Sequence, residues 1–363
     1  MKVLFIGNYR NYSGWGDAAY NKILSMYSAG IDLYLNNLDF NQGYRQCQLL
    51  DELERKKTNK FDYIIQYTLP ELYHYESNGK VIGNYECEAT FTTSGWHKHI
   101  NMLDEAWVSC EESAFQSRVS GVDKPIHIIP NAVNLEAIRT NPIAAEIGEL
   151  QGGYNFLFVG ELTKRKNVRA LLEAFHLEFH PDENVNLFLK LNKTGHSSSD
   201  TYNVFQSLNE NVKNSLRIRK HYKEVICKTD YVPTQHLWAM MQNCHCFVCP
   251  SFGEGWCIPA IESQAMGLQM VYNEKTAVRD YAHKQQVSFA AYKSPCIGVV
   301  DGKENLYNAY EYWSDFKIEN LMQSMRYAYE TRNTFNKEAV IEHTKQWSIE
   351  NVGQKIKEQL ENA

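Results

Sequence analysis

Two carboxylates lie eight residues apart in the stretch CPSFGEGWCIPAIESQAMG, residues 249–267, where Glu254 and Glu262 flank Pro259. A carboxylate can accept two hydrogen bonds from a vicinal diol, the group that a ribose or a hexopyranose presents. Pro259 suits the first turn of a helix because it has no backbone N–H to leave unpaired. The spacing therefore predicts one carboxylate in a loop and one in the helix that follows, both facing one ligand.

The start of that helix offers a second kind of recognition. The first N–H groups of a helix have no partner within it, and the helix dipole favours negative charge there, so a phosphate is well placed beside the diol. The preceding residues CHCFVCPS, 244–251, have the apolar character of a buried strand. The loop thus lies at the carboxyl end of a strand, where ligands of doubly wound sheets bind.

Strands and helices alternate along the chain in two rounds, which indicates parallel sheets covered on both faces. The strands of the first round are expected at residues 2–8, 31–37, 61–68, 80–86, 105–109 and 126–133. Those of the second are expected at residues 154–161, 185–191, 225–232, 244–251 and 268–273. The predicted fold class is α/β, with two doubly wound Rossmann-like domains that face each other across a cleft.

The length of 363 residues suits two domains. Residues 135–153 lack a strand pattern and contain Pro142 and the sequence QGG, so we place the domain junction there. The N-terminal domain is then residues 1–140, the C-terminal domain is residues 154–330, and residues 337–363 form terminal helices able to pack back on the N-terminal domain.

Composition excludes several classes of protein. The chain has 37 basic and 43 acidic residues and a net charge of −6, so no general field attracts it to nucleic acid or to an anionic membrane. No apolar run is long enough to span a bilayer, and the short apolar start is typical of a first strand. Nine scattered cysteines favour a reducing, cytoplasmic location. Cys244, His245, Cys246 and Cys249 share one strand, so neighbouring side chains diverge, which favours core packing over a metal site.

The sequence EGWCIPAIESQAMG resembles the E-x7-E signature of the retaining family 4 glycosyltransferases, which have the GT-B fold. Two further segments, IIPNAVN at 128–134 and FVGELTKRKNVRALLEAF at 158–175, are similar to other motifs of that family in order and spacing. The resemblance covers residues 128–267. It implies a retaining hexosyl- or pentosyltransferase that moves a sugar from a nucleoside diphosphate sugar, UDP-linked in our expectation, to an acceptor hydroxyl bound by the N-terminal domain.

Site residues follow from the resemblance position by position. Glu254 would contact the donor sugar near the reacting carbon, Glu262 would hold the donor ribose, and Lys166 would neutralise the leaving diphosphate. His97, in TTSGWHKHI, is the candidate for the family's catalytic histidine, with His99 beside it. The remaining expected donor-binding residues are Arg165, Gly14, Gly16, Gly255, Trp256, Cys257 and Ile258.

The chain departs from the family pattern at several positions. Glu161 stands where the family has a diphosphate-binding arginine, so Lys164 or Arg165 would have to replace that contact. Cys257 and Ala132 stand in place of glycines. No D-x-D triplet occurs in the chain, and the prediction is of no metal and no cofactor beyond the nucleotide sugar itself.

The acceptor remains open between a glycan, a lipid-linked sugar and a hydroxymethylated base in DNA. The aromatic loop YRNYSGWG at residues 9–16 is compatible with DNA. So is a basic patch made of Arg217, Arg219, Lys220 and Lys223, although a solvated helix end is the default interpretation of that patch. A second alternative is a GT-B protein that binds a nucleotide or a glycan without catalysis.

Overall fold

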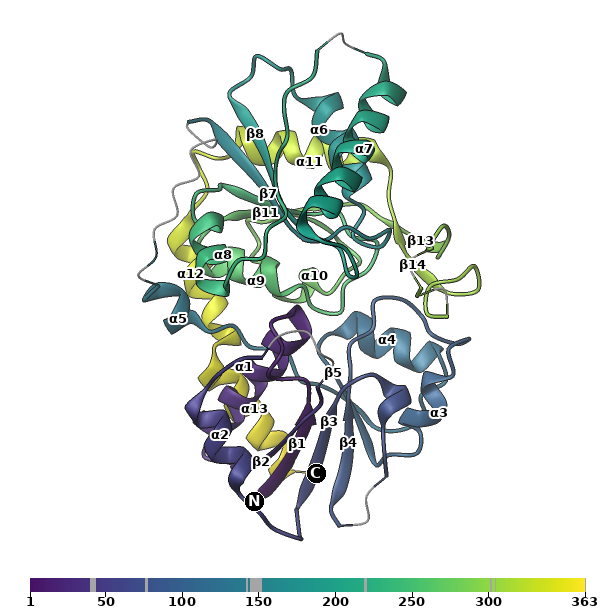
Figure 1. The fold of residues 1–363 in the computed structure, drawn as a ribbon, viewed down its shortest axis with the longest axis vertical. Coiled ribbons are helices and arrows are strands. Elements are labelled where there is room, and N and C mark those ends of the chain that lie inside the picture. Colours follow the sequence, from purple (N-terminus) through teal and green to yellow (C-terminus); the bar gives the residue numbers. More distant parts are fainter. Residues whose placement is uncertain are drawn as a thin grey trace.

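The computed structural model describes residues 1–39, 44–75, 78–141, 143, 152–218, 221–300, 302–303 and 305–362. Its two halves are stacked along the longest axis of the molecule, with the N-terminal half below and the C-terminal half above (Figure 1). Within the expected junction at 135–153, residues 142 and 144–151 lie outside the described residues, and the helix α5, Leu135–Arg139, stands at its beginning.

The N-terminal half is a six-stranded parallel sheet in the order β2-β1-β3-β4-β5-β6. Its strands are β1 Lys2–Gly7, β2 Asp32–Asn37, β3 Tyr63–Tyr67, β4 Lys80–Asn84, β5 Glu105–Val108 and β6 Ile126–Ile128. Its helical segments are α1 Gly14–Ser28, α2 Gln48–Arg55, η1 Pro70–Leu72, α3 Trp96–Ile100 and α4 Glu111–Val119. Strand β1 is a continuous apolar run because helices cover both faces of the sheet.

The C-terminal half repeats this design with the strand order β12-β11-β10-β7-β8-β9, again all parallel. Its strands are β7 Tyr154–Glu161, β8 Val185–Asn192, β9 Ile226–Lys228, β10 Cys246–Cys249, β11 Gln269–Asn273 and β12 Val287–Phe289. Its helices are α6 Val168–Glu178, α7 Ser198–Leu216, α8 Thr234–Met241, α9 Ile258–Ala265, α10 Val278–Tyr281 and α11 Ile318–Glu330. The prediction of two doubly wound domains is confirmed.

An antiparallel hairpin, β13 Tyr292–Pro295 and β14 Tyr312–Asp315, was not expected from the sequence. It lies beside the N-terminal half in Figure 1, near α4. The Glu311 carboxylate at its base accepts hydrogen bonds from the Thr92 hydroxyl at 2.9 Å and from the Thr93 amide at 2.6 Å. The hairpin therefore ties the C-terminal half to the segment that follows β4.

The chain ends with α12 Lys337–Thr344, η3 Lys345–Trp347 and α13 Ile349–Glu361. Helix α13 returns to the N-terminal half and packs along α1 (Figure 1). The close approach depends on Gly353, because a Cβ atom built there would lie 2.1 Å from the carbonyl oxygen of Ser25 in α1. Val352 and Ile356 of α13 are completely buried in this contact.

Substitution of Gly353 by alanine should force α13 away from α1 and lower the free energy of unfolding by about 1–3 kcal/mol, the usual cost of overpacking. Urea denaturation measures this loss. Gln354→Ala, one residue further along the same helix on its exposed side, is the matched control and should change stability by less than about 0.5 kcal/mol. Equal stability of both variants would show that the two helices are not in this close contact.

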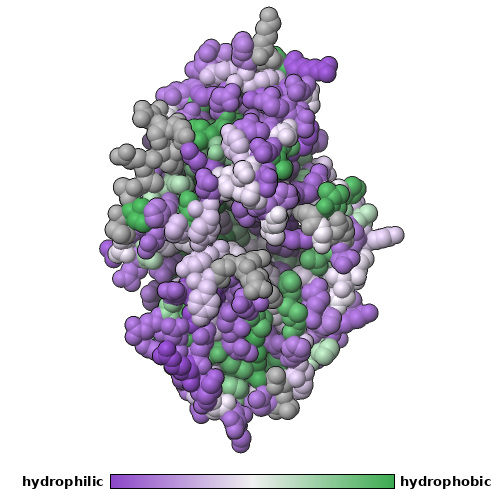
Figure 2. All heavy atoms as spheres, viewed as in Figure 1, coloured by the Kyte–Doolittle hydropathy of each residue, from purple (hydrophilic) through white to green (hydrophobic). Residues whose placement is uncertain are grey.

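Most of the surface in this view is hydrophilic, and the apolar residues form separate patches (Figure 2). Within the described ranges, none of the helices is both long and apolar enough to cross a membrane.

Candidate functional site

The loop that carries Glu254 belongs to the C-terminal half and contacts the N-terminal half. It leaves β10 and enters α9, as expected from the sequence, and α9 begins at Ile258 with Pro259 in its first turn. The close approach of this loop to the N-terminal half requires glycine at position 253, since a Cβ atom on Gly253 would lie 1.8 Å from the carbonyl oxygen of Glu88. The Gly255 carbonyl lies within hydrogen-bonding distance of the Ser109 hydroxyl. The glycines of the motif thus bring the loop that carries Glu254 against the N-terminal sheet.

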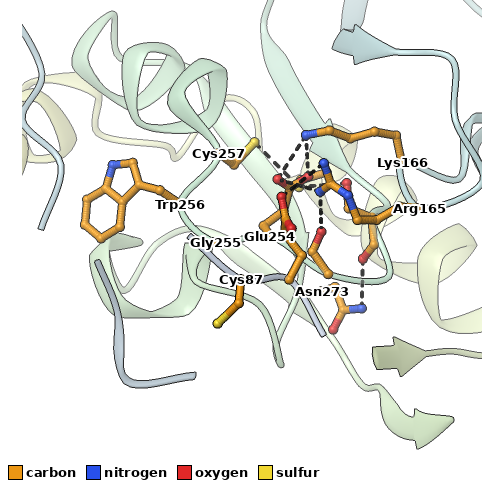
Figure 3. A network of polar contacts seen from close by, with 12 residues as sticks. Cys87, Arg165, Lys166, Glu254, Gly255, Trp256, Cys257 and Asn273 are labelled. Atoms are coloured by element: carbon orange, nitrogen blue, oxygen red, sulfur yellow. Dashed lines mark hydrogen bonds and ion pairs between the residues drawn. The ribbon is translucent and has the colours of Figure 1, made fainter. Parts of the chain in front are cut away.

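Glu254 forms the centre of a buried ionic cluster with Lys166 and Arg165 (Figure 3). The Lys166 ammonium donates to both carboxylate oxygens of Glu254, at 2.7 and 2.9 Å, and the Arg165 guanidinium donates at 3.3 Å. Burial by itself would raise the pKa of the Glu254 carboxyl, but the charges of Lys166 and Arg165 outweigh burial and lower the pKa. The structure thus brings together three of the predicted site residues, and Glu254 is held as a carboxylate.

Glu262 occupies a different environment, although it lies only about one turn into α9. Its side chain is buried, and Asp17 of α1 places a second negative charge nearby. Burial first, and the charge of Asp17 second, raise the pKa of the Glu262 carboxyl to about 8, against a small opposing effect of the Trp238 indole. In the ligand-free protein Glu262 is therefore mostly protonated at neutral pH, whereas Glu254 is ionised.

This raised pKa makes stability depend on pH. Between about pH 4.5 and pH 8 the folded chain keeps a proton on Glu262 that the unfolded chain has released, so stability falls as pH rises through this window. From pH 6 to pH 8 the wild type should lose about 2 kcal/mol of unfolding free energy relative to Glu262→Gln, because each pH unit is worth about 1.4 kcal/mol. Urea denaturation at both pH values tests this, and parallel pH profiles for the two proteins would contradict it.

Six of the seven residues between the two carboxylates are buried, and Pro259 is partly exposed. The Trp256 ring lies 4.8 Å from the Tyr281 ring and points away from the ionic cluster (Figure 3). Cys257 has a φ of 70°, in the left-handed region that favours glycine. This conformation explains physically why the resembling family has glycine there. The Cys257 and Cys249 sulfur atoms lie 4.0 Å apart.

Gly16 is used for packing in the N-terminal half. A Cβ atom at Gly16 would lie 2.1 Å from the carbonyl oxygen of Asn11. The loop before α1 can therefore pack against the start of this helix only if residue 16 is a glycine. A Cβ atom at Gly14 would meet nothing within 4 Å. Ser13 caps α1 by accepting from the Gly16 amide. Direct contact of these glycines with a donor remains a prediction.

His97 lies in α3, where its ring packs against the backbone of Gly121. Among the described residues, no hydrogen bond, ion pair or ring contact joins His97 to Glu254, Lys166 or Glu262. Figure 1 places α3 at the outer side of the N-terminal half. The catalytic role expected of His97 thus stays a prediction, without support from the ionic cluster.

A buried polar network that sequence reasoning missed lies where the N-terminal strands end. The Glu86 carboxylate, after β4, accepts from the Tyr67 hydroxyl at 3.0 Å and from the Asn131 amide at 2.7 Å, and lies beside Ser109. Burial raises the pKa of the Glu86 carboxyl. A Cβ atom at Gly255 would lie 2.9 Å from this carboxylate. Only the position of Glu86 at the end of the strand predicted at 80–86 could have indicated this network.

Glu161, which replaces the family's arginine, ends β7 and accepts a hydrogen bond from the Thr194 amide at 3.0 Å. Burial tends to raise the pKa of its carboxyl, but hydrogen bonding by Thr194 and the charges of Lys303 and Arg165 lower it. Glu161 thus has a structural partner and two cations nearby. Lys164 instead lies over the Phe252 ring, at 5.6 Å.

The predicted basic patch is only partly visible, because Arg219 and Lys220 lie outside the described residues. Arg217 ends α7, and the Lys223 ammonium donates to the Glu183 carbonyl at 2.6 Å. An open groove of about 650 Å³ lies here, and it is of mixed charge. Its lining residues are Glu210, Lys213, Asn214, Arg217, His221, Tyr222 and Glu224.

The cysteines of β10 and its approach are buried side chains of the C-terminal half. His245 accepts a hydrogen bond from the Asn155 amide and stacks on the Tyr154 ring. One set of potential ligand atoms converges among the described residues, namely those of Cys249, Glu254 and Cys257, within 4.8 Å of one another. The Lys166 ammonium already pairs with the Glu254 carboxylate of this set, at 2.7 Å.

Comparison with known proteins identifies one family and several solved structures to which this chain is similar. Residues 141–293 match the family described as glycosyl transferases group 1. No curated protein matches the chain. Three similar solved structures are described as trehalose-6-phosphate from E. coli bound with UDP-2-fluoro glucose, Anabaena HepE in complex with UDP-glucose, and sucrose-phosphate synthase from Thermosynechococcus elongatus. In that order their sequence identities are 10, 11 and 12%, and their TM-scores are 0.69, 0.67 and 0.66.

These alignments cover 100% of this chain in each case, and 99, 100 and 98% of the respective neighbours. At such identities the likeness shows the fold alone, and that fold is GT-B. The chain therefore has a GT-B fold, and residues 141–293, most of which lie in its C-terminal half, are similar to glycosyl transferases group 1.

Proposed function

We propose that this protein is a retaining glycosyltransferase that transfers a sugar from a UDP-linked donor to an acceptor hydroxyl. The observation that carries the proposal is the buried cluster in which Lys166 binds both oxygens of Glu254 at the start of α9. It places a fixed cation, a carboxylate and the N-terminus of a helix at one point of a group 1 glycosyltransferase domain. Two of the similar structures hold UDP sugars, which supports a UDP-linked donor here.

The donor in this proposal extends from Glu254 to Glu262. Glu254 binds hydroxyl groups of the sugar, the helix start and Lys166 face the diphosphate, and Glu262 accepts hydrogen bonds from the ribose diol. Each contact matches the chemistry of its group, since carboxylates accept from diols and cations stabilise phosphate. Ribose binding would favour the ionised form of Glu262 and release its proton.

Catalysis in this scheme consists mainly of stabilising the leaving group. The bond between the anomeric carbon and the phosphate oxygen breaks as the acceptor oxygen attacks from the same face, and the acceptor proton passes to the departing phosphate. Negative charge grows on the diphosphate during this step, so Lys166 and Arg165 stabilise the transition state more than the ground state. A similar structure concerns glycosyl transfer with retention by trehalose-6-phosphate synthase, which favours a retaining outcome.

The acceptor is proposed to bind on the N-terminal half, opposite the donor loop. The polar groups that reach this region are those after the ends of β3, β4 and β5, including Glu86 and Ser109. Its charged members, the Glu86 carboxylate and the Lys22 ammonium, offset each other's charge, so neutral hydroxylated molecules, such as glycans, suit such a site better than polyanions. We therefore favour a sugar acceptor over a base in DNA.

A thermal-shift screen of nucleotides and nucleotide sugars tests the proposal before an acceptor is known. A ligand present at about a hundred times its dissociation constant adds about 2.7 kcal/mol to stability. We expect UDP and one UDP sugar to raise the melting temperature by several degrees, and UMP to raise it less. Uniform absence of a shift with every uridine and guanosine diphosphate sugar would contradict the proposal.

A further inference from the structure

Glu88 of the N-terminal half reaches into the cationic part of the donor site. Its carboxylate lies 3.3 Å from the Arg165 guanidinium and accepts a hydrogen bond from the Tyr307 hydroxyl at 2.8 Å. Tyr307 belongs to the loop of the β13–β14 hairpin. Glu88 therefore joins three elements: the segment after β4, the hairpin loop and the basic turn before α6.

The charges of this site cancel in the ligand-free arrangement. Arg165 and Lys166 contribute two positive charges, and Glu88 and Glu254 contribute two negative charges in direct contact with them. The side chains of Arg165 and Lys166 are each 15% exposed, so solvent screens these pairs weakly. A diphosphate that approaches Arg165 meets a neutral cluster instead of a cationic one.

Space is also restricted beside Arg165. The cavity on that side has a volume of about 10 Å³ and is lined by Thr163, Val299, Lys303 and Tyr307. Such a volume holds a single water molecule at most. A diphosphate can therefore contact this face of the guanidinium only after Glu88 and the hairpin loop have moved.

We propose that Glu88 is a further residue of the donor site, supplied by the opposite domain, which occupies the diphosphate-binding face of Arg165 and must be displaced when the donor binds. This inference rests on the proposed function, because it takes Arg165 as a ligand of the donor diphosphate. Separation of the halves withdraws Glu88 and leaves the C-terminal site with one net positive charge. Donor binding is thereby coupled to the contact between the domains.

Calorimetric titration of the full chain with UDP, and separately with inorganic pyrophosphate, tests this role. Glu88→Gln keeps the shape of the side chain and removes its charge, so it should tighten binding of both probes by about tenfold. Glu88→Asp, which keeps the charge, and Glu71→Gln, an exposed carboxylate of the same domain, should stay within about threefold of the wild type. Unchanged or weaker binding by Glu88→Gln would overturn the inference.

Two further outcomes separate the inference from the proposed function. Tyr307→Phe removes one contact of Glu88 but no charge, and should tighten binding of both probes by about threefold. This variant tests the inference independently if Glu88→Gln folds poorly. Unchanged binding by Tyr307→Phe counts against the inference. If pyrophosphate binds tenfold tighter to Glu88→Gln while UDP binds no better than pyrophosphate, the uridine donor is wrong but Glu88 keeps its role. Failure of both probes to bind any variant contradicts both.

Discussion

Glu254→Gln should lower turnover of a UDP sugar by about a hundred- to a thousandfold, the usual loss when one electrostatic contact to a transition state is removed. The same change should destabilise the fold by about 3–5 kcal/mol, because it leaves the buried Lys166 ammonium without its partner. Initial rates of UDP release and urea denaturation measure the two effects. Both effects follow from the same pair of contacts at 2.7 and 2.9 Å.

A double variant separates catalysis from folding. Lys166→Met combined with Glu254→Gln removes both charges, so most of the lost stability should return, whereas turnover should stay at the level of the single variant or below. Recovery of turnover together with stability would show that the ionic pair serves only the fold. Arg169→Met, which breaks the exposed pair of Arg169 with Glu173, is the matched control and should change neither quantity appreciably.

Gly253→Ala is expected to prevent closure of the two halves. The new Cβ atom would lie 1.8 Å from the carbonyl oxygen of Glu88, and backbone on both sides cannot yield as a flexible side chain can. Turnover should fall by about a hundredfold or more, since a displacement of roughly 1 Å at a reacting centre has that effect. Small-angle scattering should show a larger radius of gyration than in the wild type.

Lys275→Ala is the control for that variant, because Lys275 is exposed on a loop of the same domain. It should leave both turnover and the radius of gyration unchanged. If Gly253→Ala retains wild-type turnover and the wild-type radius, the donor loop does not pack against the N-terminal half in solution.

The regular elements could be predicted from the sequence because each is encoded locally. The runs at 2–8 and 154–161 coincide closely with β1 and β7, since continuous apolar residues followed by a glycine mark buried parallel strands. Glu254 and Glu262 could be placed in a loop and a helix because Pro259 marks a helix start. The environment of each carboxylate, one ionised and one mostly protonated, depends on distant residues.

The contacts between the halves could not be predicted for the same reason. Glu88 and Ser109 meet the loop that carries Glu254, and Tyr307 meets Glu88, only after both sheets have formed. The hairpin carrying Tyr307 has a mixed pattern that does not distinguish it from a loop. The prediction of a catalytic role for His97 has no support from the ionic cluster. A histidine in an aromatic, polar segment carries no local sequence pattern that fixes where its side chain lies in the fold. Long-range packing decides such positions, and a single sequence does not display it.

The most direct test of the proposed transfer is release of UDP from a UDP sugar, followed by the anomeric form of the sugar that appears first. Wild-type protein should release UDP slowly with water as acceptor, and proton NMR should detect the sugar initially in the same anomeric configuration as in the donor. The variant that combines Lys166→Met with Glu254→Gln should release none above background. Tight UDP-sugar binding with no release by the wild type, or first appearance of the inverted anomer, would contradict a retaining glycosyltransferase.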